Sequence, residues 1–113
     1  KRYDSHFKEQ KNIQITNCQR PDSANAYFFY PVLVSSRDAV VDKLKEKCID
    51  TRIAYSMPLY EQALYREGRE AYRKMSCSVV EDFTSRVINL PIFPSLKDKD
   101  VDIISQAVLK AVE

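Results

Sequence analysis

The sequence contains a single glycine, Gly68, and a single histidine, His6, among its 113 residues. Loops that cradle a phosphate need several glycines, because only glycine lets the backbone approach so closely, so a P-loop or a dinucleotide-binding turn is excluded. One histidine cannot complete a histidine metal set, and no cysteine or serine forms a recognisable nucleophile pair with it. The sequence therefore predicts no catalytic residue, no cofactor-binding residue and no metal ligand in this chain.

Long apolar runs and a strong net charge are also missing. No stretch approaches the roughly 18 to 20 apolar residues that cross a bilayer, and the polar start Lys1–Ser5 does not resemble a signal peptide. Basic and acidic side chains alternate along the chain, which leaves a formal net charge of +2. We therefore expect a cytoplasmic protein with neither a membrane nor a nucleic-acid partner.

Cysteine is sparse: Cys18, Cys48 and Cys77 are odd in number and widely spaced. This spacing favours neither a disulfide framework nor a metal site with closely spaced ligands. We expect reduced thiols, with Cys48 and Cys77 buried as small apolar groups at helix ends.

The start of the chain predicts the tail of a helix and a short strand. Tyr3 and Phe7 are spaced to share one face of a helix over Tyr3–Gln10. Because the chain begins in this pattern and without Met, we expect a larger protein to precede Lys1. Ile13–Thr16 then alternates apolar and polar residues, as a short edge strand does.

A central strand is predicted next, after turn residues over Arg20–Asn25. Tyr27–Val34 is apolar on both faces and rich in aromatic and β-branched residues, which is typical of a buried strand. Pro31 donates no ladder hydrogen bond, so this strand needs either a bulge or an unpaired side near that residue.

The remaining chain alternates helical patterns with extended ones. Serine followed three positions later by an acidic residue predicts capped helix starts at Ser35, Ser78 and Ser95. We expect a helix over Ser36–Lys47, then a strand over Thr51–Tyr55 and a helical patch after Pro58. An exposed loop over Glu67–Lys74 leads to a helix from Ser78 to near Ile88. An extended segment over Leu90–Pro94 and a last helix after Ser95 complete the order. The last two helices have apolar stripes of Val79, Val80, Phe83 and Val87, and of Val101, Ile104, Val108 and Ala111.

This order of elements predicts an α+β fold, with helices packed on one face of a small mixed or antiparallel sheet. Asp98, Asp100 and Asp102 gather at the start of the last helix and could bind a cation, but a calcium loop also needs a glycine and a terminal glutamate. Favourable interaction of the carboxylates with the positive end of the helix explains the cluster more simply.

Five segments in a fixed order carry a resemblance to a known family. They are Ala26–Val34, Arg37–Lys47, Ile49–Arg52, Tyr55–Tyr60 and Leu90–Pro94. Residues 25–113 resemble the C-terminal small domain of the DegT–DnrJ–StrS family, whose members use pyridoxal phosphate (PLP) to transfer an amino group onto nucleotide-linked keto sugars. The resemblance implies that residues 1–113 are a single domain with the C-terminal fold of fold-type I (aspartate aminotransferase-like) PLP enzymes, and that residues 1–24 are a lead-in helix tail and edge strand.

The resemblance also implies where the chemistry takes place. The Schiff-base lysine and the groups that hold PLP belong to the family's large domain, and Lys43, Lys45 and Lys47 match no part of that lysine's motif. We therefore expect this chain to be inactive alone and to close one wall of the cleft, with an N-terminal large domain, a homodimer partner and a nucleotide-sugar substrate as its partners. The activity would serve amino-sugar and polysaccharide biosynthesis.

Three residues are predicted to approach the substrate: Arg52, Tyr55 and Tyr60. In the resembled family this segment faces the active-site cleft, and arginine offers a bidentate grip on phosphate. Tyr60 stands where the family often has histidine, and Cys48 stands where it commonly has glycine. A structural role is the alternative, because arginine on a strand usually pairs with carboxylates and tyrosines beside prolines usually pack loops.

Two functions from other classes remain as alternatives. A free-standing α+β interaction module without catalytic duty would explain the missing motifs. A single-stranded RNA binder would use Tyr27, Phe28, Phe29 and Tyr30 as a stacking platform. Adjacent strand residues point to opposite faces, so at most half of these rings could stack on bases, and the basic surface that RNA needs is missing.

Overall fold

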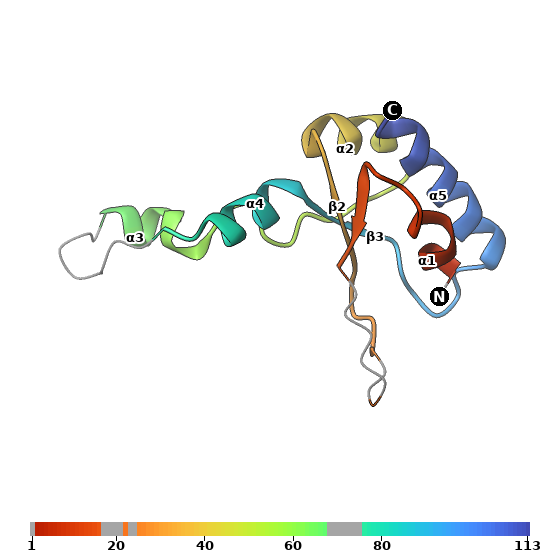
Figure 1. The fold of residues 1–113 in the computed structure, drawn as a ribbon, viewed down its shortest axis with the longest axis horizontal. Coiled ribbons are helices and arrows are strands. Elements are labelled where there is room, and N and C mark those ends of the chain that lie inside the picture. Colours follow the sequence, from red (N-terminus) through yellow and green to blue (C-terminus); the bar gives the residue numbers. More distant parts are fainter. Residues whose placement is uncertain (1, 17–21, 23–24, 68–75) are drawn as a thin grey trace.

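The computed structural model describes residues 2–16, 22, 25–67 and 76–113. Figure 1 shows a body, formed by the sheet with α1, α2 and α5, from which an arm carrying α3 and α4 projects. The elements follow in the order α1 (Arg2–Phe7), β1 (Ile13–Ile15), β2 (Tyr30–Val34), α2 (Arg37–Glu46), the 3-10 turn η1 (Leu59–Glu61), α3 (Ala63–Glu67), α4 (Ser78–Arg86), β3 (Val87–Leu90) and α5 (Asp98–Ala111). We define the arm as residues 53–67 and 76–86. Cys18 lies outside the described residues, as do most of the turn expected over Arg20–Asn25 and most of the loop expected over Glu67–Lys74.

The sheet is antiparallel, in the order β1-β2-β3. The predictions of β1 as an edge strand and β2 as the central strand are both confirmed, but β2 begins at Tyr30 and not at Tyr27 as predicted. Tyr30, Val32 and Val34 of β2 share one face with Ile88 and Leu90 of β3, and all five are at most 2% exposed. This face is the sheet's contribution to the core.

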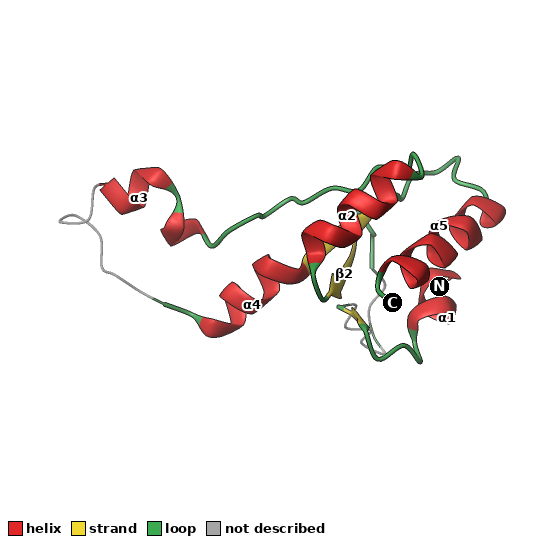
Figure 2. Ribbon diagram, turned by 90° about the horizontal axis from the view of Figure 1, so that it is seen from above, coloured by secondary structure: helices red, strands yellow, loops and turns green. Residues whose placement is uncertain are grey.

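Three helices cover that face and confirm the α+β prediction. Figure 2 shows α1 and α5 side by side on the body with α2 next to them, α4 meeting the start of α2 and α3 farther out. The apolar stripe of α5 is buried as its spacing predicts, with Val108 at 0% exposure. Val40 and Leu44 of α2 pack into the same core cluster. Helical periodicity therefore identified the buried face of α5.

The first helix is tied to the sheet through buried tyrosines. The hydroxyl of Tyr3 donates to the Pro91 carbonyl at 2.9 Å, and that of Tyr30 donates to Asp4 Oδ1 at 2.5 Å. Burial raises the pKa of both phenols, so both stay protonated and keep donating at neutral pH. The predicted pair of Tyr3 and Phe7 is buried on one helix face, with ring centroids 6.0 Å apart.

The acidic cluster of α5 holds α1 in position. Asp102 accepts from Arg2 Nη2 at 2.6 Å and lies 2.8 Å from His6 Nε2, while Asp98 accepts from Arg2 Nη1 at 2.9 Å. In the part of the chain that the structure describes, no group of acidic, histidine and cysteine side chains is suited to a metal ion. Asp98 and Asp102 therefore serve as ion-pair partners of α1.

Pro31 is accommodated without a bulge. The pairing of β2 with β3 runs in continuous register, with Pro31 opposite Asn89. On the other side the described pairing with β1 stops at Ile15 and Val32, and the Thr16 hydroxyl donates to the Pro31 carbonyl at 3.1 Å. Pro31, which has no N–H to donate, thus lies just beyond the last described pair of β1 with β2. This side of β2 is the unpaired side that we predicted.

Helix α2 ends in a left-handed residue although that residue is not glycine. Cys48 has φ 57°, Cys48 N donates to the Lys45 carbonyl, and Ile49 N donates to the Leu44 carbonyl. These are the bonds of a Schellman motif, in which the left-handed position favours glycine. A side chain with a Cβ costs about 1–2 kcal/mol there, so the helix exit is strained.

All three predicted serine caps are wrong. The residues that cap α2, α4 and α5 are Ser36, Cys77 and Lys97, and none of them makes a side-chain capping hydrogen bond. The start of α2 is held by a contact to another helix instead. Arg37 Nη1 donates to the Thr84 carbonyl at 2.6 Å and joins the start of α2 to the last turn of α4.

The boundary between α4 and β3 also differs from the prediction. The helix ends at Arg86 and β3 begins at once with Val87, whereas we expected helix to near Ile88 and extended chain only from Leu90. The segment over Thr51–Tyr55 is not a strand and contributes one bridge, between Arg52 and Asn89. Pairing of Val87 and Ile88 with β2 sets the first outcome, and pairing of Arg52 with Asn89 of β3 sets the second.

The apolar residues of α4 are mostly not buried, contrary to the predicted stripe. Val79 is 76% exposed and Val80 is 39% exposed, and within α4 the buried residue is Thr84. Cys48 and Cys77 are exposed rather than buried. Because α4 belongs to the arm and not to the body, the core helices do not cover its apolar side.

Candidate functional site

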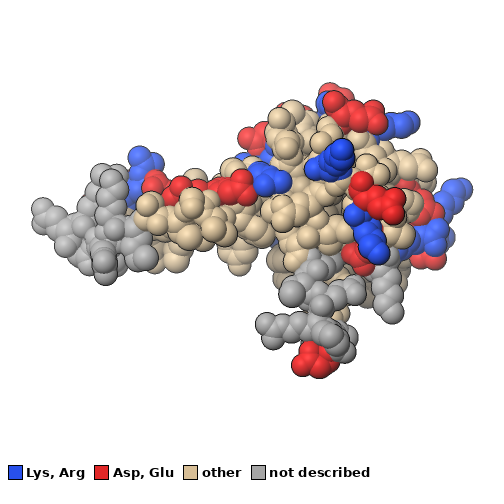
Figure 3. All heavy atoms as spheres, in the orientation of Figure 1, with Lys and Arg blue, Asp and Glu red and all other residues tan. Residues whose placement is uncertain are grey.

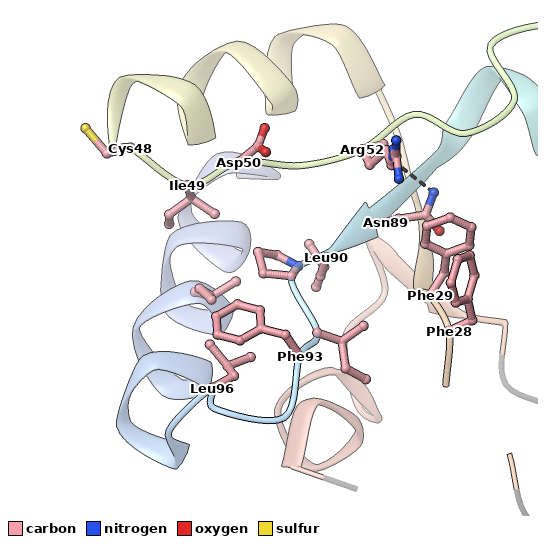
Figure 4. A pocket seen from close by; sticks show the side chains of 13 residues that line it. Phe28, Phe29, Cys48, Ile49, Asp50, Arg52, Asn89, Leu90, Phe93 and Leu96 are labelled. Carbon is pink, nitrogen blue, oxygen red and sulfur yellow. Dashed lines mark hydrogen bonds between the residues drawn. The ribbon is translucent and has the colours of Figure 1, made fainter. Parts of the chain in front are cut away.

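A groove of about 580 Å³ lies where the arm joins the body. Figure 4 shows Arg52 and Asn89 at one end of it, with Phe93 and Leu96 at the other. Its walls come from the exit of α2, the end of β3, the proline-rich segment after β3, and α5. The lining residues are Phe28, Phe29, Cys48, Ile49, Asp50, Arg52, Asn89, Leu90, Pro91, Ile92, Phe93, Leu96 and Ile104.

The polar end of the groove is fixed by backbone pairing. Arg52 N donates to the Asn89 carbonyl at 3.1 Å, and Asn89 N donates to the Arg52 carbonyl at 2.9 Å. The Asn89 side chain adds a third bond, from Nδ2 to the Arg52 carbonyl at 2.9 Å. Since these bonds hold the Arg52 backbone against Asn89, the exposed Arg52 side chain leaves the backbone at a fixed point beside the groove.

Sequence reasoning missed Asn89. Its side chain is only 6% exposed, although asparagine is usually a surface residue. The signal was present, because Asn89 is the lone polar residue in the otherwise apolar run of β3. A buried amide in a strand requires a partner, and the Arg52 carbonyl is that partner.

Aromatic side chains stand beside the polar end. Phe28 and Phe29 meet edge to face with centroids 4.6 Å apart, and Figure 4 shows both next to Asn89. Phe28 is 83% exposed, whereas Tyr30 is buried at 1% exposure. The four consecutive aromatics therefore do not form the common platform that an RNA-binding sheet would need.

Tyr60 lies on the arm and is engaged by neighbouring groups. Its hydroxyl donates to Glu81 Oε1 at 2.7 Å and accepts from the Cys77 backbone N–H at 3.1 Å. The hydrogen bond to Glu81 raises the pKa of Tyr60 above its ordinary value, because ionisation would remove the donated proton. Tyr60 is thus a neutral phenol at physiological pH.

The three predicted substrate residues do not converge on one spot. Arg52 lines the groove, whereas Tyr55 and Tyr60 belong to the arm and are not among the lining residues. Tyr55 is 68% exposed. Any ligand that met all three would have to extend from the groove along the arm.

The groove does not fit PLP by itself. PLP chemistry requires a lysine amine to form the Schiff base, and no lysine is among the lining residues that the structure describes. Lys43 of the neighbouring helix α2 instead donates from Nζ to the Ala111 carbonyl at 3.0 Å. The described residues could supply a substrate wall but not a cofactor site.

Within the described residues, no helix has both the length and the apolar character needed to span a bilayer. Figure 3 shows basic and acidic side chains interspersed over the body, and acidic side chains along one edge of the arm. This face presents no continuous basic surface of the kind that binds nucleic acid.

Comparison with known proteins finds relatives that are named as aminotransferases of nucleotide-linked sugars. The chain is 31% identical over 87 residues to dTDP-3-amino-3,6-dideoxy-alpha-D-galactopyranose transaminase of Aneurinibacillus thermoaerophilus, which covers 77% of this chain and 23% of that protein. It is 25% identical over 83 residues to UDP-N-acetyl-3-dehydro-alpha-D-glucosamine 3-aminotransferase of Acidithiobacillus ferrooxidans, covering 74% of this chain and 21% of that protein.

Solved structures agree with these relatives. The structure of DesV from S. venezuelae, in complex with a ketimine intermediate, superposes with a TM-score of 0.84 at 26% identity, over 98% of this chain and 29% of that one. The chain thus spans less than a third of the length of its relatives. Residues 1–109 match the DegT/DnrJ/EryC1/StrS aminotransferase family, a match that includes α1 and β1 as well as the segments that carried the resemblance. This chain therefore belongs to the DegT/DnrJ/EryC1/StrS aminotransferase family.

Proposed function

We propose that residues 1–113 are the C-terminal small domain of a PLP-dependent aminotransferase that acts on nucleotide-linked keto sugars. The observation that carries this proposal is the match to the family over residues 1–109, together with the shared fold of DesV over 98% of the chain. Two curated relatives, one named for a dTDP-linked and one for a UDP-linked amino sugar, support the substrate class.

The reaction exchanges two functional groups. An amino donor gives its nitrogen to the keto carbon of the sugar and leaves as a keto acid, so the sugar carbonyl becomes an amine. PLP supplies the electron sink for this exchange when it is bound, and the rest of the protein would hold it. The proposed contribution of this chain is to close one wall of the cleft, to grip the nucleotide sugar and to exclude water.

Arg52 is the proposed anion-binding residue of that wall. Its guanidinium can take a phosphate by two parallel hydrogen bonds, and the pairing of its backbone with Asn89 limits the entropy lost on binding. Asp50 lines the same groove. Its carboxylate suits the hydroxyl groups of a nucleotide sugar as an acceptor, whereas Arg52 suits the diphosphate.

Tyr55 and Tyr60 are proposed to meet the sugar-nucleotide along the arm. Tyr55 has an exposed ring and hydroxyl for stacking or hydrogen bonding. The hydroxyl of Tyr60 already donates to Glu81, so its remaining lone pair can only accept from a substrate hydroxyl or amide. These roles rest on the arm facing the cleft of the complete enzyme.

We also propose that the complete protein is a cytoplasmic homodimer of amino-sugar or polysaccharide biosynthesis.

The proposed aminotransferase activity is tested by a labelled-nitrogen assay on the full-length, PLP-loaded protein, with glutamate as donor and dTDP- or UDP-linked keto sugars as acceptors. The proposal predicts labelled amino sugars. Transfer to simple keto acids alone would contradict the substrate class, and no transfer to any acceptor would favour an interaction module without catalytic duty.

A further inference from the structure

The two legs of the arm meet at the hydroxyl of Tyr60. One leg, residues 53–67, contains Tyr60, and the other, residues 76–86, contains Cys77 and Glu81. Tyr60 donates to Glu81 Oε1 at 2.7 Å and accepts from Cys77 N at 3.1 Å, and Cys77 N also lies 3.3 Å from Glu81 Oε1. The three groups form a closed set of hydrogen bonds, which we call the arm clamp.

The arm clamp joins parts of the chain that are distant in sequence. Tyr60 is 21 residues from Glu81 and 17 from Cys77. Glu81 lies in the first turn of α4, so its carboxylate stands at the positive end of that helix. An ionised acceptor makes the bond from the phenol stronger than one between neutral groups.

Apolar packing in the arm is weak in comparison. Leu59 and Leu64 of the first leg are 61% and 68% exposed, and Val79 of the second leg is 76% exposed. In the body, by contrast, the core residues of the sheet are almost fully buried. Since exposed side chains stabilise a contact little, directional hydrogen bonds must set how the legs lie against each other.

The base of the arm is fixed separately. Arg52 pairs with Asn89 on the first leg's side, and Arg37 Nη1 holds the Thr84 carbonyl on the second. The Arg37 side chain is 13% exposed, so this contact is well shielded. Both legs are thus anchored at the body. The arm clamp then sets the position of the segment between Arg52 and Tyr60, which contains Tyr55.

We propose that Glu81 is a positioning residue, which acts through Tyr60 to hold the Tyr55–Tyr60 segment against α4 and so sets the wall that meets the nucleotide sugar. The inference rests on the proposed function for what the wall meets, but the clamp itself is a property of the chain. Glu81 does not touch the substrate in this account. Tyr60 contributes by its place in the clamp and, towards the substrate, only as an acceptor.

Hydrogen exchange in the full-length protein tests the clamp without any activity. Glu81→Ala and Tyr60→Phe are expected to raise amide exchange in both legs, over residues 59–67 and at Cys77, by about tenfold, the size expected for losing one charge-assisted surface bond. Glu81→Gln keeps an acceptor oxygen and should give a smaller rise. Asp82→Ala is the matched control, because it removes a neighbouring carboxylate that pairs with Arg86 instead.

Kinetics with the nucleotide sugar then test the link to the site. Glu81→Ala and Tyr60→Phe should each raise KM about tenfold with a smaller change in kcat, and the double variant should be no worse than either single one. Independent, additive effects would contradict action through Tyr60. If amide exchange is unchanged in both single variants, the arm clamp is wrong, whatever the activity. If the protein aminates no nucleotide sugar, the proposed function is wrong, and amide exchange still tests the arm clamp.

Discussion

Arg52 and Asn89 exchange both of their backbone hydrogen bonds, at 3.1 and 2.9 Å, outside any named strand pair. The Asn89 amide adds its own bond to the same Arg52 carbonyl. Through this pair the arm is attached to the free edge of β3, and the arginine proposed to bind phosphate is held at the groove. The rigid sheet thus positions a residue that lies outside it.

Removing the Asn89 side chain should destabilise the protein. Asn89→Ala deletes a hydrogen bond to a carbonyl and leaves a small void, which we expect to lower the free energy of unfolding by about 1–3 kcal/mol. Asn89→Asp should cost more, because a buried carboxylate would face the Arg52 carbonyl without a donor. Urea unfolding of the full-length protein measures both, and Gln14→Ala on the exposed side of β1 is the control. An Asp variant as stable as wild type would contradict this account.

Glycine in place of Cys48 should stabilise the exit of α2. Cys48 has φ 57° at the left-handed position of a Schellman motif, where a Cβ is unfavourable. Cys48→Gly relieves about 1–2 kcal/mol of strain, and the greater freedom of glycine in the unfolded chain offsets part of it, so we expect a net gain of roughly 0.5–1 kcal/mol. Cys48→Ala keeps the strain and should change little. A loss of stability in the glycine variant would show that the side chain makes a stabilising contact.

Asp102 makes stability depend on pH. Its hydrogen bonds to Arg2, and then to His6, hold the pKa of its carboxyl well below the usual range. A lowered folded-state pKa gives a stabilisation that is present above the ordinary pKa of about 3.9 and is lost as the pH falls through the folded-state pKa. Asp102→Asn should therefore be less stable than wild type near pH 7, with a difference that shrinks below about pH 4. Urea midpoints against pH check this, and Asp98→Asn, whose carboxyl side chain is 78% exposed, should show a weaker effect.

Tyr60 should titrate later than an exposed tyrosine. The hydrogen bond to Glu81 raises its pKa, so its phenol should ionise above about pH 10, and Glu81→Gln should lower that pKa again. Nuclear magnetic resonance of ring-labelled tyrosine, with the signal assigned by Tyr60→Phe, measures it. An identical titration in wild type and Glu81→Gln would mean that the two side chains are not bonded in solution.

The sequence was sufficient for the elements whose pattern is local. The stripe of α5 and the pair Tyr3 and Phe7 could be predicted because helical spacing alone decides which side of a long helix is buried. The same reasoning failed on α4. Val79 and Val80 have the right spacing, but the helix stands in the arm, and spacing does not say whether anything covers the face it creates.

The parts of the site that were missed depend on contacts between distant residues. Val87 and Ile88 leave the helical pattern because they pair with β2, and Asn89 acquires its role from Arg52, 37 positions earlier. Ser78 and Glu81 looked like a capping box, yet Glu81 bonds Tyr60 of the opposite leg and reaches back to Cys77 N. The motif therefore identified Glu81 as a residue that bonds the backbone at the start of α4, but it did not predict the bond to Tyr60.

The kinetics of Arg52 variants test the central claim most directly. In the full-length, PLP-loaded protein, Arg52→Ala should raise KM for the nucleotide sugar by about tenfold to a hundredfold, since a charge-assisted bidentate contact is lost, while KM for the amino donor stays unchanged. Arg52→Lys should recover part of the loss, and Arg66→Ala, a cation of α3 that pairs loosely with Glu61 at 3.9 Å, should leave both constants unchanged. If Arg52→Ala has the same KM for the nucleotide sugar as wild type, this groove does not hold the substrate and the account is wrong.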